Sequence, residues 1–450
     1  MIGFFLESKC AAEGIIELFA HMGISVSTQT TRNLVRSLTK SAAERNRHLP
    51  PSQFIYDNFD MDFKVAQPTV GSRGSHASMT SAIFAPYADL RPGDLTFTKE
   101  LHAKSRFNKD LLPGNPLIYT PHIRDIIPKR ELENGLHALS KAFAWHMRAI
   151  LLQQDQSFAK YLPMLGLPEA INSLPVTRTI QYPASAINAD EGSHDGNWQV
   201  FENILKQGGV PDARLEDDVI LVHGDLATKE RIDGLRKMRT IESESKGQLA
   251  FVIFSPGLFH LKMAATDAYW RAHVQPCEGR EDTAGFFDYV RHLRPKETAK
   301  FINGPGFRRL HDSIHHATWL DVLDCFRLEF KARGFQSREA FALSNPTWDS
   351  IIKISDEIVH KYIPGDDFGD IREQDNSVRD LVFENTSLRK QHGLLYLELS
   401  HAMNYGDVGR ILRVLPYWIA VFKSTGKSKY AAHMIQFITD LDHVYPKRLK

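Results

Sequence analysis

The spacing of apolar residues near the start of the chain predicts two helices joined by a short turn. Apolar side chains in residues 11–20 recur at helical intervals, and residues 28–47 continue as a second, more polar helix. Ser27 or Thr28 is expected to cap the second helix, and Gly23 lies in the turn. This order is typical of a helix-turn-helix, although an ordinary helical hairpin with a solvated face has the same pattern.

In a helix-turn-helix, the first residues of the second helix face DNA bases. In this chain the expected nucleic-acid-binding residues are Gln29, Thr31, Arg32 and Arg36. Residues 23–50 hold five Lys or Arg residues against one Glu, which makes this segment locally basic. DNA is therefore the expected partner of the N-terminal element.

Strand patterns begin after this helical element. Residues 54–65 alternate apolar and polar side chains as a half-buried strand does, and residues 81–87 have the composition of another strand. Short apolar runs at 218–225 and 248–255 are typical of buried strands, with a charged helix at 227–239 between them. This order predicts a βαβ unit with a parallel pair of strands.

The patterns together predict an α/β protein. We expect a central mixed sheet, resembling an RNase H-like core, with large helical insertions and a helical N-terminal element. The expected parts are residues 1–50, helical; 51–100, the first core strands; 101–178, a helical insertion; 179–275, the remaining core strands and helices; 276–380, a helical insertion; and 381–450, C-terminal helices that close the core.

Composition adds few constraints. The 450 residues carry a net charge of +1, so any basic surface must be local. The three cysteines, Cys10, Cys277 and Cys325, form no disulfide framework, which favours a reducing compartment. No apolar run approaches the roughly 18 residues that span a bilayer, and the first residues lack the features of a secretory signal. We expect an intracellular protein, nuclear or cytoplasmic, without a membrane partner.

Three acids have the layout of an RNase H-like nuclease or transposase core. Asp57 lies in the first strand, Asp225 ends a later strand, and Glu398 lies on a C-terminal helix. Such cores use carboxylates because hard cations, held by oxygen ligands, assist displacement at a phosphodiester. These residues are the predicted catalytic and metal-binding acids, with Mg²⁺ or Mn²⁺ as the expected cofactor.

Each acid also has an ordinary structural interpretation. Asp225 has the position of a helix N-cap. For the strand acid, Asp60 is an alternative to Asp57 on the same strand. Glu398 would be a half-exposed helix residue paired with Lys390 or His401.

Histidines provide further candidates. His260 begins a helix just after a strand, where it would act beside the acids or serve as a core or capping histidine. His311 and His315 are spaced as a zinc site allows, but no HExxH motif or nearby cysteine completes one. Glu398 and His401 repeat the ExxH spacing of di-iron bundles, which need two such pairs. Hydrogen-bonded histidines are the preferred interpretation.

Common nucleotide and hydrolase motifs are absent from the sequence. It contains no GxxxxGK[ST] phosphate loop, no GxGxxG fingerprint and no GxSxG elbow. ATP hydrolysis, NAD chemistry and serine hydrolysis are therefore not expected.

Six segments carry a resemblance to a known family. They are FIYDNFDMDF, HGDLATKERIDGLRKMR, SPGLFHLKMAATDAYW, GPGFRRLHDSIHH, LLYLELSHAMNYGDVGRI and GKSKYAAHMIQFI. Together they resemble a large uncharacterised domain family expanded in mushroom-forming fungi, over about residues 15 to 446. The many divergent copies of that family per genome imply a transposon origin. The resemblance implies no catalytic assignment. Members usually continue past VYPKRLK, so we expect a truncated copy.

The preferred functional hypothesis is a transposase-like nucleic-acid-processing protein with metal-dependent phosphodiester chemistry. One alternative is a catalytically inactive DNA-binding or protein-interaction domain, in which the acids cap helices or pair with arginines. Another is a helical scaffold without a nucleic-acid role. The position of the acids relative to one another distinguishes the first hypothesis from the others, because metal–oxygen bonds are only about 2.0–2.6 Å long.

Overall fold

The structure is a computed structural model of the chain that describes residues 1–9, 11–63, 74–108, 126, 132–133, 136–365, 368–375 and 377–450. Two compact units make up the chain. The first, here called the sheet unit, comprises Met1–Tyr119, Thr177–Gly257 and Val444–Lys450. The second, the helical unit, comprises Thr120–Val176 and Leu258–His443.

A five-stranded mixed sheet in the order β5-β2-β1-β6-β7 forms the centre of the sheet unit. β1 and β2 are long and antiparallel, β5 is antiparallel to β2, and β6 and β7 continue the sheet in parallel with β1. The strands are β1 Ser52–Phe63, β2 Ser75–Pro86, β5 Tyr182–Pro183, β6 Ile220–Gly224 and β7 Val252–Pro256. The predicted mixed sheet and its parallel βαβ pair are confirmed.

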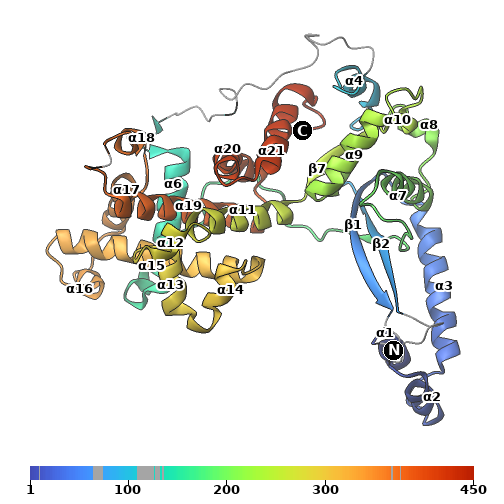
Figure 1. The fold of residues 1–450 in the computed structure, drawn as a ribbon, viewed down its shortest axis with the longest axis horizontal. Coiled ribbons are helices and arrows are strands. Elements are labelled where there is room, and N and C mark those ends of the chain that lie inside the picture. Colours follow the sequence, from blue (N-terminus) through green and yellow to red (C-terminus); the bar gives the residue numbers. More distant parts are fainter. Residues whose placement is uncertain are drawn as a thin grey trace. The chain divides into compact units, whose positions relative to one another are not determined.

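Helices cover this sheet and extend from it. They are α1 Ile2–Ser8, α2 Glu13–His21, α3 Thr28–Asn46, α4 Thr98–Ala103, α7 His194–Gln207, α8 Asp212–Leu215, α9 Leu226–Met238 and α10 Ser245–Gln248. Figure 1 shows α7 and α9 beside the β1–β2 hairpin. Their apolar side chains share one core with the sheet, in which Phe54 and Tyr56 alternate inward along β1 and Phe201 packs edge-on against Tyr56.

Among its described residues, the helical unit consists of helices and one short pair of strands, β3 Leu132–Glu133 with β4 Leu136–His137. Its helices are α6 Ala138–Gln154, α11 Leu258–His273, α12 Cys277–Glu281, α13 Phe286–Leu293, α14 Thr298–Ile302, α15 Phe307–Ala332, α16 Arg338–Leu343, α17 Trp348–Tyr362, α18 Phe368–Arg372, α19 Leu381–Asn404, α20 Val408–Ser424 and α21 Ser428–Thr439. Helices of other types are the 3-10 helices Gln156–Met164 and Pro295–Glu297 and the π-helix Asp440–Val444.

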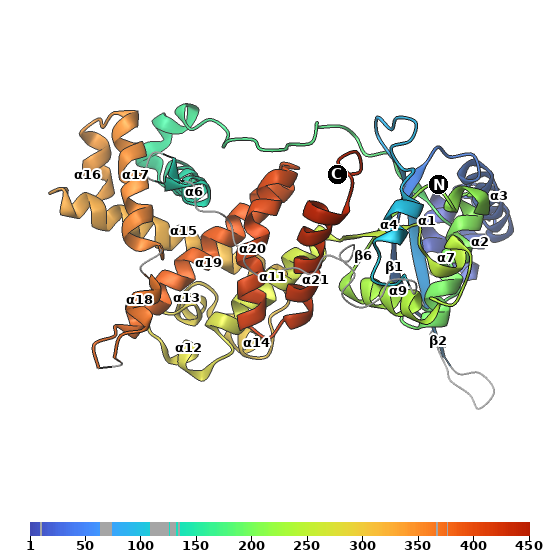
Figure 2. The same ribbon diagram turned by 90° about the horizontal axis from the view of Figure 1, so that it is seen from above.

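The long helix α19 organises the core of the helical unit. It packs against α6, α11, α15 and α20, which lie around it (Figure 2). Because these neighbours surround its C-terminal half, every residue from Gly393 to Ser400 is buried, polar ones included. A helix that is covered on all sides has no solvated face to receive its polar side chains. Those side chains must therefore find partners within the core.

Candidate functional site

The candidate site of the sheet unit is formed by β1, the end of β6 and the loop before α7. Asp57 is exposed on β1, and Asp225 directly follows the last residue of β6. Glu191 comes from the loop before α7 and is only 7% exposed. The charges of Asp225 and Asp57 both act on the Glu191 carboxyl group. The structure therefore groups two predicted acids with a third that sequence analysis missed.

Asp225 caps α9, as its alternative interpretation predicted. Its Oδ1 accepts a hydrogen bond from the Thr228 backbone N–H at 2.7 Å and another from the Thr228 hydroxyl at 3.0 Å. Within the described part of the chain, no donor is bonded to the other carboxylate oxygen. Capping therefore occupies one oxygen of Asp225 and leaves the second for another ligand.

Glu191 is the unusual member of the group. The Thr228 hydroxyl lies 3.5 Å from its Oε1, whereas its Oε2 is buried and has no hydrogen-bond partner among the described residues. Burial, followed by the charges of Asp225 and Asp57, raises the pKa of Glu191 to about 7. A buried carboxylate without a full set of donors is costly, and such groups concentrate at functional sites.

Hydrogen bonds fix the backbone that carries Glu191. The Asn197 side chain donates to the Glu191 carbonyl at 3.2 Å and accepts from the Tyr56 hydroxyl at 3.1 Å. The Thr80 hydroxyl donates to the Ala189 carbonyl at 2.8 Å. These bonds tie the loop to β1, β2 and α7, so the unpaired oxygen of Glu191 is held by rigid elements rather than by a free loop.

Gly196→Ala should destabilise the protein by about 1–3 kcal/mol, because it overpacks this loop. A Cβ at Gly196 would lie 1.8 Å from the Asp190 carbonyl oxygen, so the backbone beside Glu191 would have to move. Gly14→Ala is the matched control, since a Cβ there meets nothing within 4 Å. Urea denaturation of both variants measures the difference, and equal stabilities would contradict the expected clash.

The three carboxylates influence one another without forming a preassembled set of ligands. In the residues that the structure describes, no three His, Cys, Asp or Glu side chains are placed to hold one metal ion. Mg²⁺ commonly keeps several waters and binds proteins through only one or two carboxylates. Asp57, Asp225 and Glu191 could therefore hold such an ion only if water completed its coordination.

The third predicted acid, Glu398, lies in the helical unit on α19. It is fully buried, and its Oε2 accepts hydrogen bonds from His146 at 2.8 Å and from Arg410 at 2.5 Å. Burial favours the protonated form, but these two donors outweigh it and lower the pKa of Glu398. The expected half-exposed pairing with Lys390 or His401 is wrong, because α19 is enclosed on all sides at this position.

Asp60 and His260 have local surroundings of their own. Asp60, the alternative strand acid, accepts a hydrogen bond from the Ser78 hydroxyl across the hairpin at 2.6 Å. His260 is half-buried at the start of α11, in the helical unit, and its ring lies edge-on to Phe259 at 6.1 Å between centroids. Its contacts place it within the helical unit, whereas the carboxylate group belongs to the sheet unit.

Comparison with known proteins identifies a family. A model of a family of unknown function, DUF6589, matches residues 120–450. The chain belongs to this family. No curated protein and no solved structure matches it. The DUF6589 match includes Glu191, Asp225 and Glu398 but leaves out β1 with Asp57, although β1 is the central strand of the sheet.

The N-terminal element, which precedes the DUF6589 match, has the predicted helix–turn–helix outline. The Ser27 hydroxyl caps α3, as expected. Thr31 is buried and donates to the Ser27 carbonyl, while Arg32 pairs with two glutamates of α1 and α2. Gln29 and Arg36 remain exposed. Of the four residues predicted to contact DNA, these two have side chains at the surface without an ion pair among the described residues.

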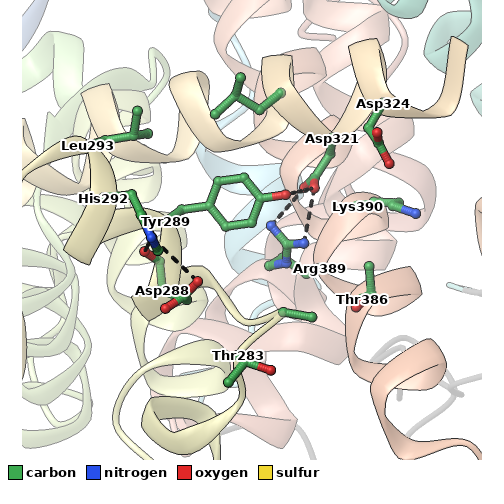
Figure 3. Close-up of a pocket in the computed structure, with 12 residues that line it drawn as sticks. Thr283, Asp288, Tyr289, His292, Leu293, Asp321, Asp324, Thr386, Arg389 and Lys390 are labelled. Atoms are coloured by element: carbon green, nitrogen blue, oxygen red, sulfur yellow. Dashed lines mark hydrogen bonds and ion pairs between the residues drawn. The ribbon is translucent and has the colours of Figure 1, made fainter. Parts of the chain in front are cut away.

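A pocket of about 450 Å³ lies in the helical part of the DUF6589 segment, between α13, α15 and α19 (Figure 3). Asp321 is buried at its floor, where it accepts hydrogen bonds from the Tyr289 hydroxyl at 2.8 Å and from Arg389 at 3.0 Å. The Arg389 guanidinium also lies over the Tyr289 ring. The ion pair makes the floor electrically neutral, so no single class of ligand follows from it.

In the described residues, no helix is long and apolar enough to cross a bilayer.

Proposed function

We propose that the sheet unit performs metal-dependent phosphodiester cleavage or transfer, in the manner of RNase H-like transposase cores. Asp57, Asp225 and Glu191 are its proposed metal-binding residues. Glu191 takes the role of third acid, which the sequence had assigned to Glu398. The observation that carries the proposal is the unpaired Oε2 of Glu191, which is buried beside two further carboxylates. A divalent cation would supply the positive charge that offsets the repulsion between these three carboxylates.

The topology of the sheet supports the proposal by analogy. The order β5-β2-β1-β6-β7, with β2 antiparallel to β1 and β5 and with β6 and β7 parallel to β1, is compatible with an RNase H-like core, although β5 has only two residues and residues 87–181 separate it from β2. Asp57 then lies on the central strand and Asp225 at the carboxyl end of the next. Because fold alone does not establish function, the carboxylates are the stronger support for this activity. We also propose that the protein derives from a transposon, as the family resemblance implies.

Each side chain has a distinct part in the proposed site. Mg²⁺ or Mn²⁺ would polarise the phosphodiester and lower the pKa of a bound water. Asp57 is exposed and can approach a substrate, whereas Asp225 is held in one orientation by its bonds to Thr228. The near-neutral pKa of Glu191 lets it release a proton when a cation binds. Gln29 and Arg36 of α3 are the proposed DNA contacts, and the proposal assigns no part to His260.

Asp225→Asn should abolish Mn²⁺ binding while preserving the fold. Asparagine caps helices about as well as aspartate, so the change removes charge without removing the cap. Calorimetric titration of Mn²⁺ into the intact chain should show binding in the micromolar to millimolar range, lost in Asp225→Asn and in Asp57→Asn.

Asp89→Asn is the matched control for these substitutions. Asp89 is exposed in the sheet unit at a positive φ of 53°, which asparagine tolerates well. Its substitution should leave binding unchanged. Mn²⁺-dependent nicking of DNA by the intact chain, lost in the same two variants, would extend the result to catalysis. If Mn²⁺ binds Asp225→Asn as it binds the intact chain, the proposed site is wrong.

A further inference from the structure

Lys262 is a largely covered lysine whose charge is not neutralised by an ion pair among the described residues. It lies on α11 and is only 8% exposed. Among the described residues no carboxylate forms an ion pair with it, and the ring centroid of Tyr396 lies 5.9 Å from its Nζ. A largely covered lysine without an ionic partner is unfavourable, so an arrangement of this kind indicates either a function or a missing ligand.

Two histidines of α15 face the same centre. His311 and His315 are one turn apart, with ring centroids separated by 4.5 Å. The Nδ1 of His311 lies 2.7 Å from the Tyr396 hydroxyl. The Nε2 of His315 is buried and has no hydrogen-bond partner among the described residues. Lys262 of α11 and the two histidines of α15 therefore gather around the Tyr396 ring of α19, so three nitrogen groups that can donate hydrogen bonds lie beside one side chain.

The surroundings of this cluster supply little negative charge. Burial lowers the pKa of Lys262, and burial together with neighbouring cationic groups lowers the pKa of His315 to about 3. The acid that acts on His311 is Asp312, which is itself within 4 Å of Arg294. The cluster thus lacks an anion.

A metal ion does not account for these residues. Zinc sites use three or four protein ligands, and of the three residues of this cluster only His311 and His315 are of a type that binds zinc. A neighbouring lysine ammonium would also repel a cation. The spacing of His311 and His315, which sequence analysis compared with zinc sites, fits a different ligand.

We propose that Lys262, His311 and His315 bind the phosphate group of a phosphomonoester. A phosphate presents several acceptor oxygens and a charge of nearly two, which a lysine and two imidazole N–H groups can satisfy together. Because Lys262 is 92% covered, a terminal phosphate can reach it more readily than a backbone phosphodiester, which has a sugar on either side. This site lies in the helical unit and does not depend on the metal site proposed for the sheet unit.

Inorganic phosphate is the first probe. Calorimetry in EDTA should detect its binding to the intact chain, and Lys262→Met should weaken that binding by about tenfold or more. Lys353→Met is the matched control, because Lys353 is exposed on α17 in the same unit. Asp225→Asn should bind phosphate normally, which separates this test from that of the metal site.

Stability measurements show whether Lys262→Met remains folded. Removal of an uncompensated buried charge should raise the melting temperature of the ligand-free protein, whereas phosphate should no longer raise it further. His315→Gln keeps a side chain that can donate a hydrogen bond and should retain part of the affinity. The proposal is overturned if the intact chain does not bind phosphate, or if Lys262→Met binds it equally well.

Oligonucleotides and a mononucleotide identify the source of the phosphate. A 5′-phosphorylated single strand should bind through Lys262, and the same strand without its phosphate should not. If a nucleoside monophosphate binds and the phosphorylated strand does not, the natural ligand is a small molecule with the same terminal group. Equal, Lys262-dependent binding of both strands would overturn the preference for a terminal phosphate.

Discussion

Arg410→Met should lower the free energy of unfolding by about 3–5 kcal/mol, the cost typical of removing one partner from a buried ion pair. Arg410 donates to Glu398 at 2.5 Å, and both side chains are almost completely buried. Without the guanidinium, the Glu398 carboxylate would keep only its bond with His146, and its Oε1 already has no hydrogen-bond partner among the described residues. Methionine preserves much of the volume, so the loss would come from charge rather than from packing.

Two further variants distinguish a charge effect from a general weakening of α20. Lys423→Met changes an exposed cation on the same helix and should alter stability by less than about 0.5 kcal/mol. The double variant Glu398→Leu with Arg410→Met should recover most of the loss, because no buried charge remains. Urea denaturation reports all three free energies. If Arg410→Met and Lys423→Met unfold at the same urea concentration, the ion pair does not stabilise the unit.

Local pattern predicted most of the strands, although β2 begins at Ser75, before the expected run at 81–87. The alternation along β1 places Phe54 and Tyr56 in the core, and the two apolar runs around α9 became the parallel strands β6 and β7. Asp225 illustrates a residue with two compatible interpretations, since it caps a helix and lies beside further carboxylates. These predictions succeeded because each depends on residues within one or two elements.

Partners that are distant in sequence could not be predicted in this way. Glu398 is bonded to His146, which lies 252 positions earlier, and nothing in the local sequence specifies that contact. Glu191 was part of a polar loop with the sequence ADEGSHDG, and its burial arises only when β1 and α9 pack around it. The sequence feature that could have indicated Glu191 is its position two residues before Ser193, which caps α7. Lys262 likewise lies on a helix whose buried face was apparent only after folding.

The family match and the fold together show that the matched segment is not a complete structural unit. DUF6589 covers β5, β6 and β7, but β1 separates β2 from β6 in the sheet and precedes residue 120. The parallel strands therefore need residues outside the match to complete their hydrogen bonding. Experiments on the site should accordingly use the whole chain rather than the matched segment, since Asp57 would otherwise be missing.

Glu191→Gln should stabilise the protein by up to about 3 kcal/mol near pH 8 and leave stability unchanged near pH 4. Glutamate ordinarily has a pKa of 4.5, and in the folded protein burial and two neighbouring carboxylates raise the pKa of Glu191 to about 7. Between these values the folded state holds a proton that the unfolded state has released. Stability therefore falls as the pH rises from 4.5 to about 7, and glutamine, which cannot ionise, should remove this loss.

Mn²⁺ makes this prediction a test of the role of Glu191. A cation that binds the ionised carboxylate should restore stability to the intact chain near pH 8 and have little effect near pH 4, because protons compete for the same oxygen. In Glu191→Gln, Mn²⁺ should stabilise much less at either pH. Glu202→Gln, an exposed change on α7, should behave as the intact chain does. A variant that is more stable at high pH but still responds fully to Mn²⁺ would make Glu191 a buried acid without a part in metal binding. If Glu191→Gln both raises stability near pH 8 and removes the stabilisation by Mn²⁺, the ion binds the Glu191 carboxylate and offsets the cost of burying its charge.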